Sequence, residues 1–342
     1  MSQVAHAFPL RLTPGLSRGD NATWALDALG LRIRSELRLV GARPDAHSAA
    51  SVGRRSVWLS QADVDASRAA PGEILLERRH ADSSLGMRVA RIDRGYLIEA
   101  PGHGTFLVAD DGSRVECDGL AEPLWRWHRP LCGQVLPLAA TLQGFELFHA
   151  SAVVLGGRAV GFVAESGTGK TSLAIALVAR GATLVTDDVL ALESTAHGVL
   201  AHPGVPTANI AAEQLALLGP SERGRLGVVI GTSDKVHVEL ANVSAEPWPL
   251  GAIYFLARSG RVERLAIEPA RPPDPRNLLS ATFLPHIATR ARLMTQLSTC
   301  GQLADFVPVF RLSVPARLTA AEVAREIERH VEEAGVTART AT

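Results

Sequence analysis

The sequence predicts an α/β protein in which a phosphate-loop core follows a mainly antiparallel β module. Three observations predict this class. Short stretches of alternating apolar residues recur between about residues 30 and 118. Residues 160–179 read as an apolar strand, a loop of small residues and an apolar helix. The length of 342 residues suffices for roughly two domains. The composition, with 46% hydrophobic and 20% charged residues, is that of an ordinary globular chain.

The first part of the chain predicts a β-rich N-terminal module over residues 1–120, of which the first 25 form a loose lead-in. Clusters of turn residues separate short strands, which are expected at 31–34, 56–59, 87–92, 96–98, 104–108 and 114–116. No residues here have the spacing of a catalytic motif. The module is therefore expected to serve packing, contact with a partner, or recognition of a molecule that accepts a transferred group. Apolar residues at helical intervals then predict a helix over 121–142, broken near Pro130, in a helical junction at 121–144.

The second domain is expected over residues 145–334, with a frayed tail at 335–342. It begins with two strands at 145–155 and 158–164, which Gly156 and Gly157 join as a hairpin. The remaining elements are predicted in turn from apolar spacing. Helices are expected at 211–218, 285–303 and 319–334, strands at 182–188, 189–192, 235–240 and 252–257, a strand or extended link at 306–314, and a Pro-rich linker at 271–275.

The loop between the strand at 160–163 and the helix that follows carries the clearest chemistry. It reads Ala164-Glu165-Ser166-Gly167-Thr168-Gly169-Lys170-Thr171, which fits the Walker A pattern G-x-x-x-x-G-K-[ST] except that Ala164 replaces the first glycine. Gly167 and Gly169 would let backbone N–H groups turn toward phosphate oxygens, and the helix N-terminus would add its positive dipole end. The alternative is a chance turn of small residues before a buried helix.

Two adjacent acids end the next predicted strand. Asp187 and Asp188 come directly after the β-branched stretch 183–186, and the alternative is a surface turn, where aspartate is common. Beside a phosphate loop, such a pair can hold Mg²⁺ and accept a hydroxyl proton.

Lysine is scarce in this chain. Only Lys170 and Lys235 are lysines among the 35 basic residues, and the other 33 are arginines. Codon bias accounts for the arginines, but a compact ammonium fits sites that exclude the wide guanidinium fork. Lys170 is therefore a candidate before any motif is considered. Lys235 could reach a phosphate or the acceptor, or be an exposed residue at the start of a strand.

Three segments together resemble the catalytic core of the HPr kinase/phosphorylase family, whose nucleotide-binding core is shared with phosphoenolpyruvate carboxykinase. They are Phe148-His149-Ala150-Ser151, the loop from Ala164 to Thr171, and Arg180-Gly181-Ala182-Thr183-Leu184-Val185-Thr186-Asp187-Asp188. The resemblance is close over about 145–195 and loose over 196–330. It implies an HPr-kinase-like ATP-binding kinase domain over 145–334, using ATP and Mg²⁺.

The resemblance also implies roles for individual residues. Asp187 would be the base that takes the acceptor's hydroxyl proton, Lys170 would hold the phosphates, and His149 would orient the centre, although a histidine in such a strand is often simply a core residue. Thr171 and Asp188 would hold the metal. The loop residues that would bind the nucleotide are Glu165, Ser166, Gly167, Thr168, Gly169, Lys170, Thr171 and Ser172.

The chain departs from the family in two respects. It lacks a second signature of the Glu-Ile-Arg-Gly type, and its first 120 residues do not match the usual N-terminal domain. It therefore looks more like divergent HPr-kinase-like proteins, some of which accompany peptide-maturation clusters. The expected function is an HPr-kinase-like serine kinase, acting on a hydroxyl of a protein or peptide acceptor. A non-catalytic nucleotide-binding accessory module is the alternative, and a carboxykinase-like lyase ranks last because no third lysine is present.

The remaining expectations concern partners and location. Lys+Arg and Asp+Glu both number 35, so the net charge is zero and nothing supports a nucleic-acid partner. The chain does not open with the basic region and following apolar stretch of a signal peptide, so no signal peptide is expected. It contains no run of about 18 apolar residues, so no membrane-spanning helix is expected. The dispersed Cys117, Cys132 and Cys300 predict neither disulfides nor a zinc site, so a cytoplasmic protein is expected. Homo-oligomer formation stays open.

Overall fold

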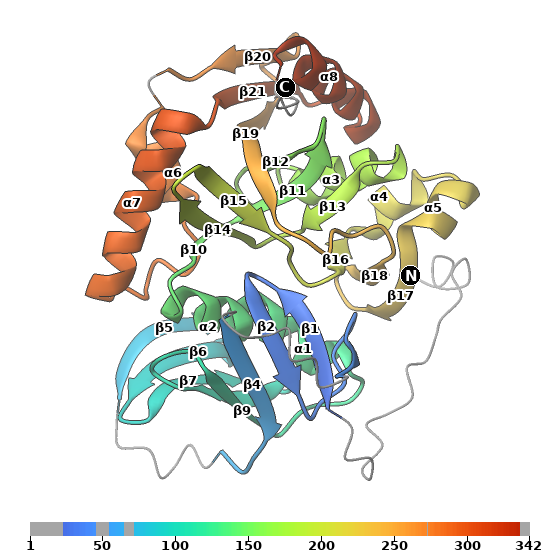
Figure 1. Cartoon of the computed structure of the whole chain (residues 1–342). Coiled ribbons are helices and arrows are strands. Elements are labelled where there is room, and N and C mark those ends of the chain that lie inside the picture. The colour runs from blue at the N-terminus through green and yellow to red at the C-terminus, as the bar shows by residue number, and fades with distance from the viewer. Residues whose placement is uncertain (1–22, 46–54, 65–71, 272, 336–342) are drawn as a thin grey trace. The chain divides into compact units, whose positions relative to one another are not determined.

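The computed structural model describes residues 23–45, 55–64, 72–271 and 273–335. Most of the expected lead-in at 1–25 and of the frayed tail at 335–342 lies outside the described residues. Within them the chain divides into an N-terminal unit, 23–145 with 284–293, and a C-terminal unit, 146–283 with 294–335. The described strands form three sheets, and helices accompany them in both units, so the fold is mixed α/β as predicted (Figure 1).

The N-terminal unit contains one sheet whose nine described strands lie in the order β3-β1-β2-β4-β9-β8-β7-β6-β5. Neighbours are antiparallel except β2–β4 and β4–β9, which are parallel. Alternation explains strands such as β2, where Leu31, Ile33 and Ser35 are buried while Arg32 and Arg34 are partly exposed. The strands are β1 Trp24–Ala28, β2 Leu31–Ser35, β3 Arg43–Pro44, β4 Ser56–Gln61, β5 Glu73–Arg79, β6 Leu85–Ile92, β7 Gly95–Ala100, β8 Gly104–Val108 and β9 Arg114–Asp118.

A helical segment closes the N-terminal unit. It consists of α1 (Trp125–Pro130), the π-helical turn η4 (Leu131–Val135) and α2 (Leu136–Leu142). Contrary to the expected break near Pro130, the helix is not interrupted there but changes from an α-helix to a π-helical turn. Proline supplies no N–H for an i→i−4 hydrogen bond, and a π-helical turn is one way to continue the helix past it.

The C-terminal unit contains a mixed sheet of order β10-β14-β15-β19-β12-β11-β13, with β21 on β19 and β20 on β21, and a three-stranded sheet β16-β18-β17. Its strands are β10 Glu146–Phe148, β11 Ala150–Leu155, β12 Arg158–Val163, β13 Thr183–Thr186, β14 Leu190–Thr195, β15 Gly198–His202, β16 Thr207–Ile210, β17 Gly227–Thr232, β18 Val236–Leu240, β19 Trp248–Ser259, β20 Ala266–Pro269 and β21 Val309–Pro315. Its helices are α3 Lys170–Ala179, α4 Ala212–Ala216, α5 Pro220–Leu226, α6 Pro275–Ser280, α7 Arg290–Phe306 (which starts in the N-terminal unit) and α8 Ala320–Glu333.

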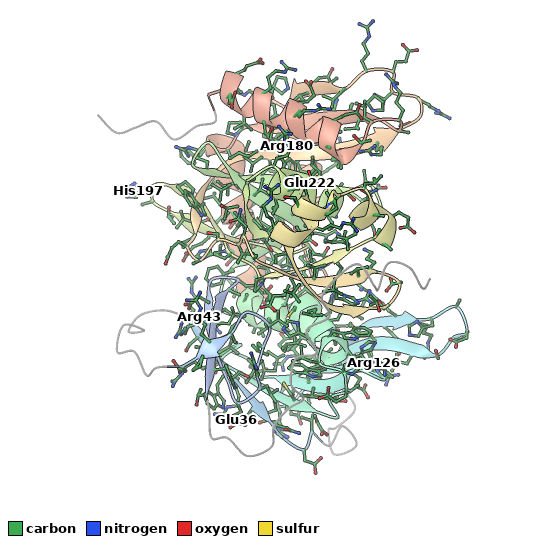
Figure 2. All side chains as sticks on the ribbon, turned by 90° about the vertical axis from the view of Figure 1, so that its right-hand side faces the viewer. Glu36, Arg43, Arg126, Arg180, His197 and Glu222 are labelled. Carbon is green, nitrogen blue, oxygen red and sulfur yellow. The ribbon has the colours of Figure 1, made fainter. Side chains whose placement is uncertain are left out.

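Helix α3 lies against the strands of the mixed sheet that lead into and out of it (Figure 1). Seven of its ten residues are buried, and its apolar ones share a core with β12, β19, β21 and α8. At the C-terminal end of α3, Arg180, which is labelled in Figure 2, donates from Nε and Nη2 to the Glu328 carboxylate of α8, at 2.6 to 3.0 Å. The core thus fixes the direction in which the start of α3 points.

Some boundaries differ from the sequence prediction. The strand expected at 145–155 is two strands separated at His149, because β10 pairs with β14 whereas β11 pairs with β12 and β13. The helix expected from residue 285 begins at Arg290. Strand β5 was not predicted, since it is largely exposed and carries no clear alternation. Among the described residues, no helix is long and apolar enough to cross a bilayer.

We expect Leu177→Ala to lower the free energy of unfolding by about 2–5 kcal/mol, because Leu177 is fully buried in the core of α3. Leu217→Ala is the matched control: Leu217 is 70% exposed, so its change is expected to stay within about 0.5 kcal/mol. Urea unfolding of the two variants measures both values. Equal losses would contradict the placement of α3 in the core.

Candidate functional site

The loop between β12 and α3 has open space at its two glycines. Gly167 has φ +83° and Gly169 φ +109°, in the left-handed region that favours glycine. A Cβ added at either position would meet no heavy atom within 4 Å. Gly169 is the N-cap residue of α3, and no side chain among the described residues caps it. The first N–H groups of the helix are therefore left to a ligand or solvent.

Lys170 is the first residue of α3 and is buried, with 6% of its surface exposed. Its Nζ donates to the carbonyl oxygen of Ala164, 2.9 Å away, so the side chain folds back over the loop. Burial lowers the Lys170 pKa most, while the charges of Asp188 and Asp187 act in the opposite direction. The ammonium is thus held by the loop, and the charges of the acidic pair act on it.

Asp187 follows the last residue of β13 and joins three segments of the unit. Its Oδ1 accepts hydrogen bonds from Ser151 Oγ of β11 (2.7 Å) and Thr171 Oγ1 of α3 (2.9 Å). The backbone N–H of Asn209, in β16, also donates to this carboxylate. Burial and then the charge of Asp188 raise the Asp187 pKa to about 6, and the hydrogen bonds reduce that rise.

Asp188 and His149 form a second contact next to Asp187. Asp188 has φ +75°, a strained conformation for a residue with a side chain, and its carboxylate is 49% exposed. His149 Nδ1 lies 3.1 Å from the Asp188 carbonyl oxygen and 3.2 Å from its Oδ1, so it is the donor. Burial lowers the His149 pKa most, and Asp188 opposes that shift.

The structure brings five of the predicted site residues together. Lys170, Thr171, Asp187, Asp188 and His149 form one cluster, in which Thr171 contacts Asp187 while Asp188 contacts His149. The loop residues Glu165, Ser166 and Gly167 are exposed, and Thr168, Gly169, Thr171 and Ser172 are partly exposed. Thr168 N–H donates to Glu165 O at 3.2 Å, which closes the turn.

The residues of this cluster can hold a magnesium ion only if a bound ligand supplies further oxygen atoms to the metal. Across the described residues, no group of three or more His, Cys, Asp or Glu side chains is placed to hold a metal. Mg²⁺ in nucleotide sites commonly takes one or two carboxylates plus substrate phosphates, and a threonine hydroxyl beside two carboxylates matches that donor set. The residues therefore fit Mg²⁺ that arrives with a phosphate.

Two contributors were missed by sequence reasoning. Ser151 lies two residues after His149 and donates to Asp187, which alternation along a strand could have suggested. Asn209 acts through its backbone N–H, for which no sequence pattern exists.

Comparisons with known proteins add little to this geometry. No protein-family model matches the chain, and no curated protein matches its sequence. Among solved structures, the Hpr(Ser) kinase/phosphatase from Coxiella burnetii is similar over 56% of this chain and 96% of that chain, at 14% identity and a TM-score of 0.32. At that TM-score the likeness carries no argument about this chain.

Asp187 is expected to destabilise the folded protein at neutral pH. Because its folded pKa is raised from 3.8 to about 6, the folded state binds the proton more tightly, and stability falls as the pH rises through this window. Asp187→Asn should therefore raise the free energy of unfolding by about 1–3 kcal/mol at pH 7.5 in EDTA, and by much less at pH 4. Urea unfolding at both pH values checks this.

Asp63→Asn is the control, because Asp63 is an exposed carboxylate. A destabilised Asp187→Asn protein at pH 7.5, or a gain that does not shrink at pH 4, would contradict the burial of this carboxylate.

Proposed function

We propose that this chain is an ATP-dependent kinase that transfers the γ-phosphoryl group to a serine-type hydroxyl of a protein or peptide acceptor. The observation that carries the proposal is the hydrogen bond from Thr171 to Asp187. It joins a residue of a phosphate-type loop to a carboxylate of suitable pKa, and phosphoryl transfer needs both in one place. The resemblance of the three sequence segments to HPr kinases supports the same activity.

The loop would hold the nucleotide's phosphates. The N–H groups of residues 165–172, apart from that of Thr168, and the N-terminus of α3 would donate to phosphate oxygens, since there is open space at the glycines 167 and 169. Lys170 would exchange its bond to the Ala164 carbonyl for a phosphate oxygen. These donors would stabilise negative charge that builds up during transfer.

Asp187 would act as the base. The acceptor's hydroxyl oxygen forms a bond to the terminal phosphorus, its proton passes to the Asp187 carboxylate, and the bond to ADP breaks. With a pKa of about 6, this carboxylate is ionised at pH 7 yet basic enough to take the proton. Ser151 and Thr171 orient it, and His149 holds Asp188 next to it.

Mg²⁺, when bound, would neutralise phosphate charge in this site. Thr171 Oγ1 and the half-exposed Asp188 carboxylate are the groups proposed to hold it. Asp187 would then be free of the metal and available to the acceptor.

Substitutions of the two aspartates are expected to impair different steps. Asp187→Asn should keep MgATP binding within about threefold and lower transfer to a seryl peptide library by about a hundredfold or more, since general-base catalysis contributes roughly 10²–10⁴-fold. Asp188→Asn should instead weaken the dependence on Mg²⁺. Calorimetry measures MgATP binding. Transfer of ³²P from labelled ATP measures activity on the seryl peptide library, and a library in which alanine replaces serine is the control.

If Asp188→Asn abolished transfer while Asp187→Asn weakened the dependence on Mg²⁺, the roles proposed for the two aspartates would be exchanged. If the wild-type protein binds MgATP but labels no seryl peptide, including peptides encoded by neighbouring genes, the chain is an accessory nucleotide-binding module and the kinase proposal is wrong.

Gly169→Ala tests the loop itself. It should weaken MgATP binding by about tenfold or more, because an added methyl group projects into the open side and φ +109° strains an alanine. Gly181→Ala is a matched control at φ +111°, also with no atom within 4 Å, at the other end of α3. Both variants should lose similar stability, and equal binding by the two would contradict the proposed phosphate loop.

A further inference from the structure

Helix α7 has an exposed face whose centre is apolar. This outer face consists of exposed residues that lie within about 100° of one another around the helix, namely Arg290, Met294, Leu297, Ser298, Gly301 and Asp305. Met294 is 61% and Leu297 68% exposed, and no charged residue occurs from position 293 to position 304. The opposite side of α7 is held by the chain itself, since Leu303 is buried in a core that it shares with β14 and β15 (Figure 1). An exposed apolar helix face of this kind is typical of a contact surface.

Gly301, in the middle of the outer face, is not required by the fold of the described residues. Its backbone is helical and its φ is not positive, and a Cβ added there would meet no heavy atom within 4 Å. In the interior of a helix, glycine lowers stability relative to alanine. A glycine at such a position is explained if another molecule approaches this point more closely than a side chain would allow.

The two charged residues of the outer face oppose the dipole of their own helix. Arg290 is the first residue of α7 and Asp305 the last but one. A cation is unfavourable at the positive N-terminal end of a helix, and an anion is unfavourable at its negative C-terminal end. Within the described part of the chain, neither side chain forms an ion pair or a hydrogen bond. Both charges therefore call for a partner that carries the opposite charge at each end.

The outer face is complementary to a second copy of itself. In two antiparallel α7 helices related by a two-fold axis between Leu297 and Ser298, each Arg290 lies opposite the Asp305 of the other copy. The same axis places each Met294 opposite a Gly301, so that a large side chain meets the position that has none. A two-fold contact requires one patch to fit a copy of itself, and this face does so in both charge and size.

We infer that the chain forms a homodimer through antiparallel contact between the outer faces of two α7 helices. Met294 of one copy packs against Gly301 of the other, and Arg290 pairs with Asp305 at both ends. The contact extends over about 22 Å of helix. One helix against one helix is a small interface, so we expect a dimer with a Kd on the order of 10 µM rather than an obligate one. The inference does not depend on the proposed function.

Sedimentation velocity of the full chain at about 1 to 200 µM tests the charge pairing. The wild-type protein should pass from monomer to dimer over this range. Arg290→Asp should raise the dimer Kd by about tenfold or more, because it places two aspartates opposite each other at both ends of the contact. Asp305→Arg should do the same with two arginines. Each single change suits the dipole of α7 better than the wild-type residue, so a lost dimer would not reflect a weakened helix.

The double variant Arg290→Asp with Asp305→Arg separates this contact from any other. It restores opposite charges at both ends in reversed order, so its Kd should return to within about threefold of the wild-type value. A chain that stays monomeric up to about 200 µM overturns the inference, and the outer face then serves a different partner. A dimer that the single changes do not weaken, or that the double variant does not restore, forms through another surface and overturns it as well.

Gly301→Ala tests the close approach at the centre of the contact. It should raise the urea midpoint of unfolding of the monomer, because alanine favours the helix, and yet raise the dimer Kd by about tenfold, because its methyl group meets Met294 of the other copy. Gly224→Ala is the matched control, since Gly224 is an exposed glycine of α5 that also has no atom within 4 Å of an added Cβ. It should raise the midpoint and leave the Kd unchanged; equal Kd values for the two variants would contradict the packing of Met294 on Gly301.

Discussion

The site depends on the hydrogen bond between Thr171 and Asp187. It joins the first turn of α3 to the end of β13, two segments that are packed into one core but reach the site from different directions. Without it, an open glycine loop and a partly buried carboxylate would be unrelated features. With it, the loop, its ammonium and a carboxylate belong to one cluster, and that combination suits phosphoryl chemistry.

Asp187 also shows why this cluster is better explained by function than by stability. Placing a carboxylate where burial raises its pKa to about 6, next to a second acid, costs free energy of folding. The left-handed backbone of Asp188 adds strain at the adjacent position. Local features that oppose folding persist when they serve a reaction or a ligand, and here they lie together beside an open loop.

Much of this could be predicted from the sequence because it is local. The alternation in β2, the glycine pair between β11 and β12, and the small-residue loop before α3 each depend on neighbouring residues alone. The break at His149 could not be predicted, since it reflects a change of strand partners along the sheet. The backbone donor at Asn209 depends on a separate three-stranded sheet, whose placement no short pattern encodes.

The most direct measurement of the central claim is a crystal structure with Mg²⁺ and a non-hydrolysable ATP analogue. The account predicts that the phosphates lie along residues 165–172, with Lys170 Nζ on a phosphate oxygen and the terminal phosphate facing Asp187. A nucleotide bound elsewhere, or one bound in the loop with its terminal phosphate directed away from the two aspartates, would contradict it.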